Sequence, residues 1–287
     1  MSGTSRAVAV GVLKGGFGKT TTAVNLGREL AHRNDRTLLI DLDDNGHMTL
    51  NLGHEEAYSA ETNHAAEVLL DGADPRQYTV DVVDGLDLFP AHVALEDVQS
   101  GLKEATMGTT RLKENLVDEV LDSEYEYIII DCPANRGKLN DNAMYATGNI
   151  IIPLRPENGY ESGLTNTIQR LVMEAREYFD LDILAVTPTD LSDRIDQDTR
   201  DRRLLHELTT RDAVARHVPN YAYLSEDDWD AVDNGDYDGA LPGIRHRGAI
   251  DNANDAGLPL RDHDSTCDQL TCYDELAQIV EAGEVQR

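Results

Sequence analysis

Lysine is scarce in this sequence, which has 287 residues and a formal net charge of −29. It occurs only at positions 14, 19, 103, 113 and 138, and the remaining positive charge is arginine. Such an acidic surface is typical of salt-adapted cytoplasmic proteins, because concentrated salt screens the repulsion between carboxylates. The alternative interpretation is an acidic protein with basic partners. On either interpretation, the two lysines near the N-terminus are informative.

Cysteines and long apolar runs are also few. The three cysteines, Cys132, Cys267 and Cys272, do not make a disulfide framework, so a reducing compartment is expected. No segment reaches the roughly 20 apolar residues that cross a bilayer, and the N-terminus lacks a long apolar run. We therefore expect a cytoplasmic protein that is neither exported nor membrane-spanning.

Continuous apolar runs separated by helical patterns predict the fold. Such runs are typical of buried parallel strands, and their alternation with helices is typical of a doubly wound sheet. We expect one α/β domain over residues 1–287, with a mostly parallel sheet flanked by helices. The expected strands are 7–13, 37–41, 86–90, 127–131, 149–154 and 182–187. The expected helices are 19–33, about 60–70, 93–103, 109–121, 140–147, 162–179, 195–209 and about 268–282.

The segment 220–242 interrupts this alternation. It is rich in acidic residues and glycine, and it holds the single tryptophan of the chain, Trp229. A segment of this length without a helical or strand pattern predicts an insertion or a long surface loop, which in a compact domain is usually functional or disordered. Its aromatic residues could also anchor it to the body of the protein.

Polar motifs stand where three of the expected strands end. The first strand ends at "KGGFGKTT", the second at "DLDDNG" and the one at 127–131 at "DCPANRG". Ligands of open parallel sheets lie beyond the carboxyl ends of the strands. We therefore expect a glycine-rich loop and several carboxylates to meet at one edge of the sheet.

The first of these motifs is a variant phosphate-binding loop. Gly15, Gly16 and Gly18 allow backbone N–H groups to turn toward an anion, and the helix that begins at Lys19 adds its positive end. Lys19 should reach the β and γ phosphates of a nucleotide, and the Thr20 hydroxyl should bind Mg²⁺. The usual motif has glycine where this chain has Leu13.

The other two strand ends supply acids. Asp131 follows four apolar residues, which is how phosphate-loop nucleotidases present a carboxylate to the outer shell of Mg²⁺. A cap or turn former is the alternative role for a strand-terminal aspartate. Asp41 and Asp43 end the second strand, and one of them could orient the attacking water.

Taken in order, these segments resemble one protein family. Residues 14–21, "KGGFGKTT", look like the deviant Walker A motif of the ParA/MinD ATPases, and "TAVNLGREL" is similar to the helix of the ParA branch. Similar segments of that branch match "DLDDNGHMTLNLG" (41–53), "YIIIDCPANRG" (127–137), "IIPLRPENGYESGL" (151–164) and "GIRHRGAIDNANDAGLPL" (243–260). The resemblance covers nearly the whole chain apart from 220–242, and it implies a P-loop NTPase fold.

The resemblance also implies roles for individual residues. In this family two subunits sandwich two ATP molecules, so Lys14 would cross the interface to the phosphates bound by the partner subunit. Asp43 would activate the water, Thr20 would bind magnesium, and Asp131 would be the Walker B acid. ATP would be held by Gly15, Gly16, Phe17, Gly18, Lys19, Thr20 and Thr21. The chain departs from the family pattern at Phe17, Asp44, Asn45 and His47, which puts the hydrolysis rate and its control in question.

ParA relatives bind DNA without sequence preference as ATP dimers and release it when a ParB-like or cargo-adaptor protein stimulates hydrolysis. The resemblance therefore implies an ATPase, slow without its partner, that segregates or positions DNA or protein cargo and associates with the nucleoid. DNA binding needs a basic surface, and the net charge of −29 opposes it except at a focused patch. The candidate residues are Arg200, Arg202, Arg203, Arg245 and Arg247, each of which could instead pair with a carboxylate.

Three other functions stay open. A MinD-like positioning ATPase would use a basic amphipathic C-terminal helix to bind lipid, but the tail of this chain is acidic. An iron–sulfur carrier like the nitrogenase iron protein would need a second cysteine on a loop near Cys132. A nucleotide-gated scaffold that hydrolyses ATP poorly would fit the altered segment 44–47.

Overall fold

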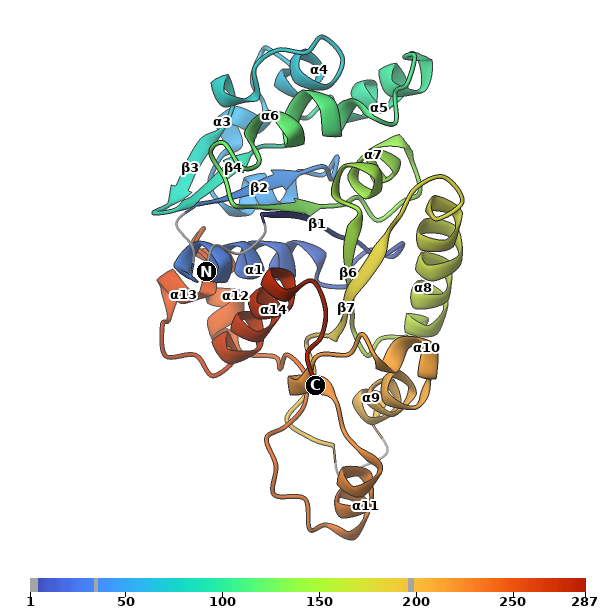
Figure 1. Ribbon diagram of the computed structural model, residues 1–287. Helices are drawn as coiled ribbons and strands as arrows, with labels where there is room; N and C mark the ends of the chain where they lie inside the picture. Colours follow the sequence, from blue (N-terminus) through green and yellow to red (C-terminus); the bar gives the residue numbers. More distant parts are fainter. Residues whose placement is uncertain (1–4, 34–35, 196–198) are drawn as a thin grey trace.

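A seven-stranded sheet runs through the centre of the computed structural model, which describes residues 5–33, 36–195 and 199–287 (Figure 1). The strand order is β3-β4-β2-β5-β1-β6-β7, and each neighbouring pair is parallel except β3 with β4. This arrangement confirms the predicted fold class. The strands are β1 (Arg6–Val10), β2 (Thr37–Asp41), β3 (Val80–Val83), β4 (Leu86–Phe89), β5 (Tyr127–Asp131), β6 (Asn149–Leu154) and β7 (Asp182–Pro188).

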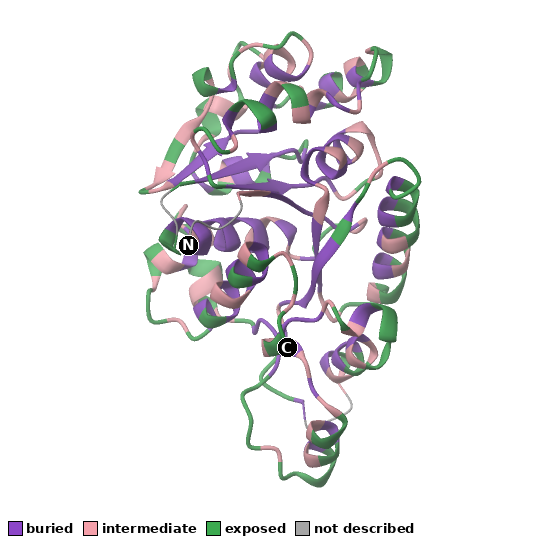
Figure 2. Ribbon diagram, viewed as in Figure 1, coloured by how far each residue is buried: buried purple, intermediate pink, exposed green. Residues whose placement is uncertain are grey.

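Helices cover both faces of the sheet, and the central strands are largely buried (Figure 2). Apolar side chains form one core cluster on each side of the sheet. Helices α1, α12, α13 and α14 cover one face, and α4, α5, α7 and α8 the other. The α-helices are α1 (Lys19–Arg33), α2 (His47–Asn51), α3 (Glu55–Tyr58), α4 (His64–Leu69), α5 (Leu95–Glu104), α6 (Asp118–Val120), α7 (Lys138–Thr147), α8 (Tyr160–Thr167), α9 (Arg200–Thr210), α10 (Asp212–Ala215), α11 (Glu226–Asn234), α12 (Gly248–Asp255), α13 (Leu260–His263) and α14 (Leu270–Ala282). Two 3₁₀ turns, η1 (Pro75–Gln77) and η4 (Asn220–Ala222), and two π-helical stretches, η2 (Lys113–Val117) and η3 (Ile168–Met173), complete the elements.

The fully buried strands agree most closely with the sequence. Strands 37–41, 127–131 and 149–154 are confirmed residue by residue, and the first strand ends three residues early, at Val10. The sequence missed β3, a short antiparallel edge strand whose residues are only partly buried. Edge strands with one exposed face lack the continuous apolar run that marks central strands.

The predicted helices differ mainly at their ends. Helix 19–33 is confirmed, and those at 60–70, 93–103, 140–147 and 268–282 shift by a few residues. The predicted helices 109–121 and 162–179 contain the π-helical stretches η2 and η3. The predicted helix 195–209 begins at Arg200, and residues 196–198 of that prediction lie outside the described part of the chain.

The acidic segment 220–242 contains a helix, α11, that the sequence pattern did not predict. Ser225 caps its first turn together with Asp228 in a reciprocal capping box, and Gly235 ends it in the left-handed conformation. These signals are typical of helix ends. The helix projects from the body of the protein beyond α9 (Figure 1). No helix within the described residues combines the length and the apolar character needed to span a membrane.

The net charge generates a prediction about stability. We expect the melting temperature to rise with KCl concentration, because 54 acidic residues face only 25 basic ones and their repulsion is screened as the Debye length falls to about 3 Å near 1 M. Each kcal/mol recovered should raise Tm by roughly 2–4 °C. Thermal unfolding followed by circular dichroism in increasing KCl measures the effect, and a melting temperature that stays constant or falls would contradict it.

Candidate functional site

The predicted phosphate loop connects β1 to α1. Gly16 and Gly18 both have left-handed backbones, with φ of +78° and +77°. A Cβ atom at Gly18 would also approach the Thr189 hydroxyl to 3.0 Å, so this position favours glycine on two grounds. The loop ends where α1 begins at Lys19, so the positive end of the helix and its first N–H groups face the loop.

A cavity of about 330 Å³ lies over this loop. All seven residues from Gly15 to Thr21 line it, and the side chain of Lys19 is largely buried beside it. Asp43, Asn45 and His47 from the second strand end line the same cavity. The structure therefore brings the phosphate loop and the second acidic motif together at the carboxyl edge of the sheet.

The third motif joins them through Asp131. The strand register places Asp131 beside Val10 of β1 and Asp41 of β2. The Thr20 hydroxyl donates a hydrogen bond of 2.6 Å to Asp131 Oδ2. Burial raises the pKa of the Asp131 carboxyl to about 8, with a further increase from Asp41, while Lys19 lowers it. The predicted magnesium residues, Thr20 and Asp131, are thus in direct contact.

This contact fits a Mg²⁺ ion. The other carboxylate oxygen of Asp131, Oδ1, is buried and has no hydrogen-bond partner among the described residues. A buried oxygen without a partner is costly unless a cation or ordered water satisfies it. Hydroxyl, carboxylate and water oxygens are the ligands that Mg²⁺ prefers. Asp131 and Thr20 could therefore hold the ion together with a nucleotide phosphate.

The two aspartates of the second strand end have different surroundings. Asp41 is fully buried, and its Oδ2 accepts hydrogen bonds from the backbone N–H (2.9 Å) and hydroxyl (2.7 Å) of Thr49. Burial raises the pKa of Asp41 to about 6. Asp43 lines the phosphate cavity, and its Oδ1 accepts from the backbone and side-chain N–H groups of Asn45 at 3.0 and 2.8 Å. Of the two aspartates, Asp43 lines the cavity, and the carboxylate of Asp41 is held by Thr49.

The structure shows where the residues of segment 44–47 that depart from the family pattern lie. Asn45 orients Asp43, as described above, and His47 lies exposed at the rim of the phosphate cavity. The Asp44 side chain is exposed, while its carbonyl accepts a hydrogen bond of 3.0 Å from the Tyr58 hydroxyl. Partial burial and its contact with Asp43 raise the pKa of Asp44. The altered segment therefore still presents one oriented carboxylate to the cavity.

Lys14 lies outside the phosphate cavity. Among the described residues of the loop, those from Gly15 onward line the cavity and Lys14 does not. Its ammonium donates a hydrogen bond to the carbonyl of Asn158, in the loop between β6 and α8. It also lies 4.9 Å from the centre of the buried Phe17 ring. In this single subunit, Lys14 is thus directed away from the phosphates of its own loop.

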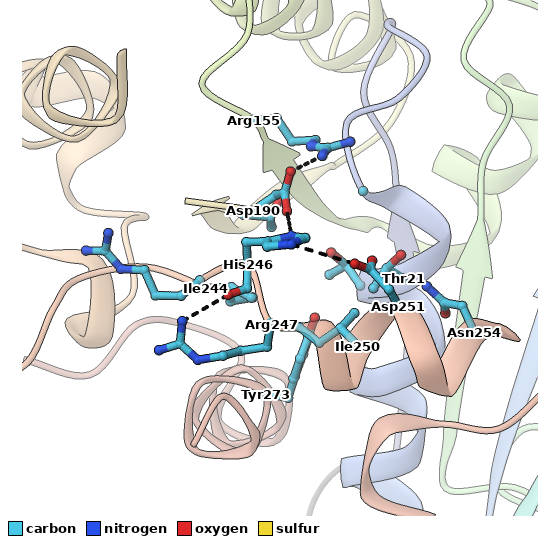
Figure 3. A pocket seen from close by; sticks show the side chains of 14 residues that line it. Thr21, Arg155, Asp190, Ile244, His246, Arg247, Ile250, Asp251, Asn254 and Tyr273 are labelled. Carbon is cyan, nitrogen blue, oxygen red and sulfur yellow. Dashed lines mark hydrogen bonds and ion pairs between the residues drawn. The ribbon is translucent and has the colours of Figure 1, made fainter. Parts of the chain in front are cut away.

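A second cavity, of about 260 Å³, continues from the phosphate loop toward the end of β7 (Figure 3). Thr21 and Arg155 line both cavities. The Arg155 guanidinium donates to the Gly16 carbonyl at 2.9 Å and pairs with Asp190, whose Oδ1 lies 2.9 Å from His246 Nδ1. The two cavities are contiguous at Thr21 and Arg155, and their volumes add to about 590 Å³ (330 and 260 Å³).

Sequence reasoning singled out some residues of this second cavity, such as Thr21 and Arg247, but it did not single out Arg155, Asp190 or His246. Asp190 has a left-handed backbone with φ of +57°, which is uncommon for residues other than glycine and worth attention near a site. It follows β7, so its place after a strand end was an available signal. Arg155 and His246 lie within the segments 151–164 and 243–260, where only the family resemblance pointed to function.

Arg245 was wrongly predicted to contact DNA. Its side chain is 1% exposed, and its guanidinium donates to the carbonyl of Ser192. Its backbone N–H donates to the side chain of Gln269 at 2.6 Å. Burial lowers the pKa of Arg245. Because phosphate contact requires an accessible cation, this arginine supports the wall of the second cavity instead.

The other arginines predicted to bind DNA lie in two places. Arg247 lines the second cavity and pairs with Asp193 at 2.8 Å and Asp268 at 2.7 Å. Arg200, Arg202 and Arg203 lie on α9, where Arg200 and Arg203 are exposed. Arg202 pairs with Asp233 of α11. Arg200 and Arg203 are therefore the exposed members of the predicted DNA surface, whereas Arg202 and Arg247 are partly buried.

Comparisons with known proteins identify the family of this chain. A family model described as an AAA domain, AAA_31, matches residues 5–181. The chain is 38% identical over 175 residues to the sporulation initiation inhibitor protein Soj of Bacillus subtilis, covering 58% of this chain and 66% of Soj, just under two thirds. It is 33% identical over 203 residues to the chromosome partitioning protein ParA of Caulobacter vibrioides, covering 68% and 75% of the two chains.

A solved structure supports the predicted ligands. Cobyrinic acid a,c-diamide synthase from Mycobacterium smegmatis, with bound ADP and magnesium, is 25% identical with a TM-score of 0.70, covering 96% of this chain and 93% of that one. The same protein has also been solved with an ATP analogue and magnesium, again at 25% identity and a TM-score of 0.69. The prediction of ATP and Mg²⁺ as ligands agrees with both.

The raised pKa of Asp131 generates a prediction. We expect Asp131→Asn to stabilise the protein in the absence of nucleotide and magnesium. The carboxyl has a pKa of about 8 in the fold and about 4 when unfolded, so the folded state binds more protons between these values and stability falls as the pH rises from about 4 to about 8. Asparagine cannot ionise, so its advantage should grow over this range, by up to about 5 kcal/mol near pH 8.

Urea unfolding of the two proteins across this pH range tests the prediction. The variant should also lose magnesium-dependent nucleotide binding, because an amide is a poorer ligand for the outer shell of the ion than a carboxylate. A stability difference that does not change with pH would show that the Asp131 carboxyl is already ionised in the folded protein.

Proposed function

Because the chain belongs to the ParA/MinD-type family of P-loop ATPases, we propose that it is an ATP-dependent dimerising switch that segregates or positions DNA or protein cargo. ATP and Mg²⁺ are its ligands. In this proposal the whole chain, 1–287, forms one ATPase domain that pairs with a second copy when ATP is bound. Hydrolysis is slow until a ParB-like or cargo-adaptor protein stimulates it.

The position of Lys14 is the observation that carries the proposal. The chain has five lysines, and one of them precedes the phosphate loop without lining the phosphate cavity. Its ammonium rests on the Asn158 carbonyl, a neutral acceptor at a half-exposed place. Breaking one such hydrogen bond costs about 1 kcal/mol. A charge-assisted contact with the phosphates of a partner subunit would offset that loss.

The other residues of the site would act within one subunit. Loop N–H groups and Lys19 would hold the phosphates, and the Thr20 hydroxyl would turn from Asp131 toward the ion. Magnesium, when bound, neutralises charge that develops on the phosphate oxygens. Asp43 would orient the attacking water and accept its proton, with Asn45 fixing the carboxylate. Positioning and charge stabilisation account for most catalysis of this kind.

Dimerisation would couple these events. Lys14 would reach the phosphates only across an interface, so ATP occupancy and subunit association become one equilibrium. Hydrolysis removes the γ phosphate that Lys14 contacts and thereby weakens the dimer. This coupling is what turns an ATPase into a switch.

The ATP dimer would bind DNA without sequence preference and place the protein on the nucleoid in the cytoplasm. The exposed arginines of α9 are the candidate contacts. A chain of net charge −29 needs such a local patch, because the remaining surface repels phosphates. The Caulobacter relative is named a chromosome partitioning protein, which favours chromosomal DNA as the cargo. The acidic surface would suit a salt-adapted cell.

Two lysine variants test the switch. We expect Lys14→Ala to bind ATP normally but to lose ATP-dependent dimerisation, because its own phosphate cavity stays intact. Lys19→Ala should weaken ATP binding about tenfold to a hundredfold, since a charge-assisted contact is worth about 1.5–3 kcal/mol, and should fail to dimerise as a result. Binding of a fluorescent ATP analogue and light scattering after size-exclusion chromatography are the two measurements.

Lys103→Ala is the matched control, because it removes an exposed lysine of α5 far along the chain. It should bind ATP and dimerise like the wild type. Normal dimerisation of Lys14→Ala would rule out the crossing lysine and with it the proposed switch.

A third variant tests hydrolysis. We expect Asp43→Asn to slow ATP hydrolysis about a hundredfold or more, because a positioned general base contributes about 10²–10⁴-fold. ATP binding and dimerisation should persist. Phosphate release with and without DNA is the measurement, and Asp44→Asn, which alters an exposed neighbour, should slow it far less. A wild type that binds ATP and dimerises without any turnover would instead be a nucleotide-gated scaffold.

A further inference from the structure

Helix α11 of the acidic segment 220–242 lies against helix α9, which carries the candidate DNA-binding arginines. Arg202, His206 and Thr209 of α9 form one stripe, because they are spaced four and three residues apart. One residue of α11, Trp229, contacts all three. Its ring centroid lies 5.3 Å from the Arg202 guanidinium and 5.4 Å from the His206 ring, and its indole N–H donates to the Thr209 hydroxyl at 3.3 Å.

The contact between the two helices is also ionic. Asp233 of α11 pairs with Arg202 of α9. Five of the nine residues of α11 are acidic: Glu226, Asp227, Asp228, Asp230 and Asp233. Of these five carboxylates, Asp233 is the one that contacts an arginine of α9, Arg202. This arrangement matches the charge that a DNA backbone would present to the same helix.

We propose that α11 is an intramolecular cover on Arg202 of α9, and that it moves aside when Arg202 joins the exposed Arg200 and Arg203 in binding DNA. The inference rests on the proposed DNA binding, and it adds a control that lies outside the nucleotide site. The Asp233 carboxylate of α11 and phosphates of DNA would compete for the Arg202 guanidinium group. The cover would thus hold DNA affinity low until enough phosphates are present to displace it.

The capping residues of α11 fit a helix that moves as a unit. The capping box of Ser225 and Asp228 and the left-handed Gly235 give α11 its own helix ends, so it can stay helical when it leaves α9. Two of its residues, Trp229 and Val232, are buried in the apolar core, and Asp233 pairs with Arg202. The Asp233 side chain is 58% exposed, so the pair is screened by salt and can open readily.

A charge-removing variant tests the cover. We expect full-length Asp233→Asn, loaded with a non-hydrolysable ATP analogue, to bind mixed-sequence duplex DNA about threefold to tenfold more tightly than the wild type, because the competing carboxylate on Arg202 is lost. The variant keeps the size of the side chain and leaves the nucleotide site untouched. Fluorescence anisotropy of labelled DNA at several salt concentrations is the measurement.

Asp227→Asn is the matched control. It removes the same charge from the same helix, but Asp227 lies two residues before Trp229, on the opposite face of α11, and is exposed. Its DNA affinity should stay close to that of the wild type. Equal gains in the two variants would reflect overall charge and would overturn the cover.

Trp229 gives an independent measurement, because it is the single tryptophan of the chain and is 8% exposed. If α11 leaves α9, the indole enters water and its emission shifts to longer wavelength. We expect this shift when DNA is added to the protein bound to the ATP analogue, and a smaller shift in Asp233→Asn without DNA. DNA that binds with no change in tryptophan emission would overturn the cover.

These outcomes separate the cover from the function on which it rests. If the wild type binds DNA and Arg200→Ala weakens that binding, while Asp233→Asn behaves like the wild type, the cover is wrong and DNA binding stands. If neither the wild type nor Asp233→Asn binds DNA, the cover and the DNA-binding part of the function both fail. The Lys14→Ala experiment still decides the dimerising switch in that case.

Discussion

The buried carboxyl of Asp131 is the constraint on which the nucleotide site depends. Burial among apolar strands raises the pKa of this group to about 8, and only the Thr20 hydroxyl and the charge of Lys19 act against that effect. A site that binds Mg²⁺ needs the ionised carboxylate, so metal and nucleotide binding should release a proton and relieve an unsatisfied oxygen. Folding already buries this carboxyl, so ligand binding does not have to remove water from it again.

The lysines at the two ends of the phosphate loop, Lys14 and Lys19, have different electrostatic surroundings. Lys19 lies inside the cavity, where the carboxylates of the neighbouring strand ends surround it. Lys14 rests on a neutral carbonyl and an aromatic ring, neither of which satisfies an ammonium as fully as an anion would. A surface cation with weak partners in its own subunit can gain a stronger contact with an anion of a second molecule. A buried cation that already lies near the carboxylates of its own site cannot.

The sequence predicted the parts of the molecule that depend on local pattern. Strands β2, β5 and β6 were found to the residue because full burial requires continuous apolar runs, and the acids that follow them could be placed at one edge. Strand β3 and helix α11 were missed because partly exposed elements carry weaker patterns. The second cavity was missed because Arg155, Asp190 and His246 come from distant loops that only the fold brings together. Arg245 was misassigned because a charged residue gives no sign in the sequence that it is buried.

Electrostatic repulsion opposes DNA binding by a strongly acidic protein, and the sequence alone shows this. Repulsion from 54 carboxyl side chains acts over a Debye length, so a basic patch must be concentrated to overcome it. Helix α9 concentrates three arginines, and such a patch would also attract the acidic surface of the same chain or of other copies. In the proposed cover, α11 contacts one of these guanidinium groups, that of Arg202, through Trp229 and Asp233 until DNA replaces it. Whether α9 binds DNA or α11 would then depend on the density of phosphates along the DNA backbone and not on the strength of any one ion pair.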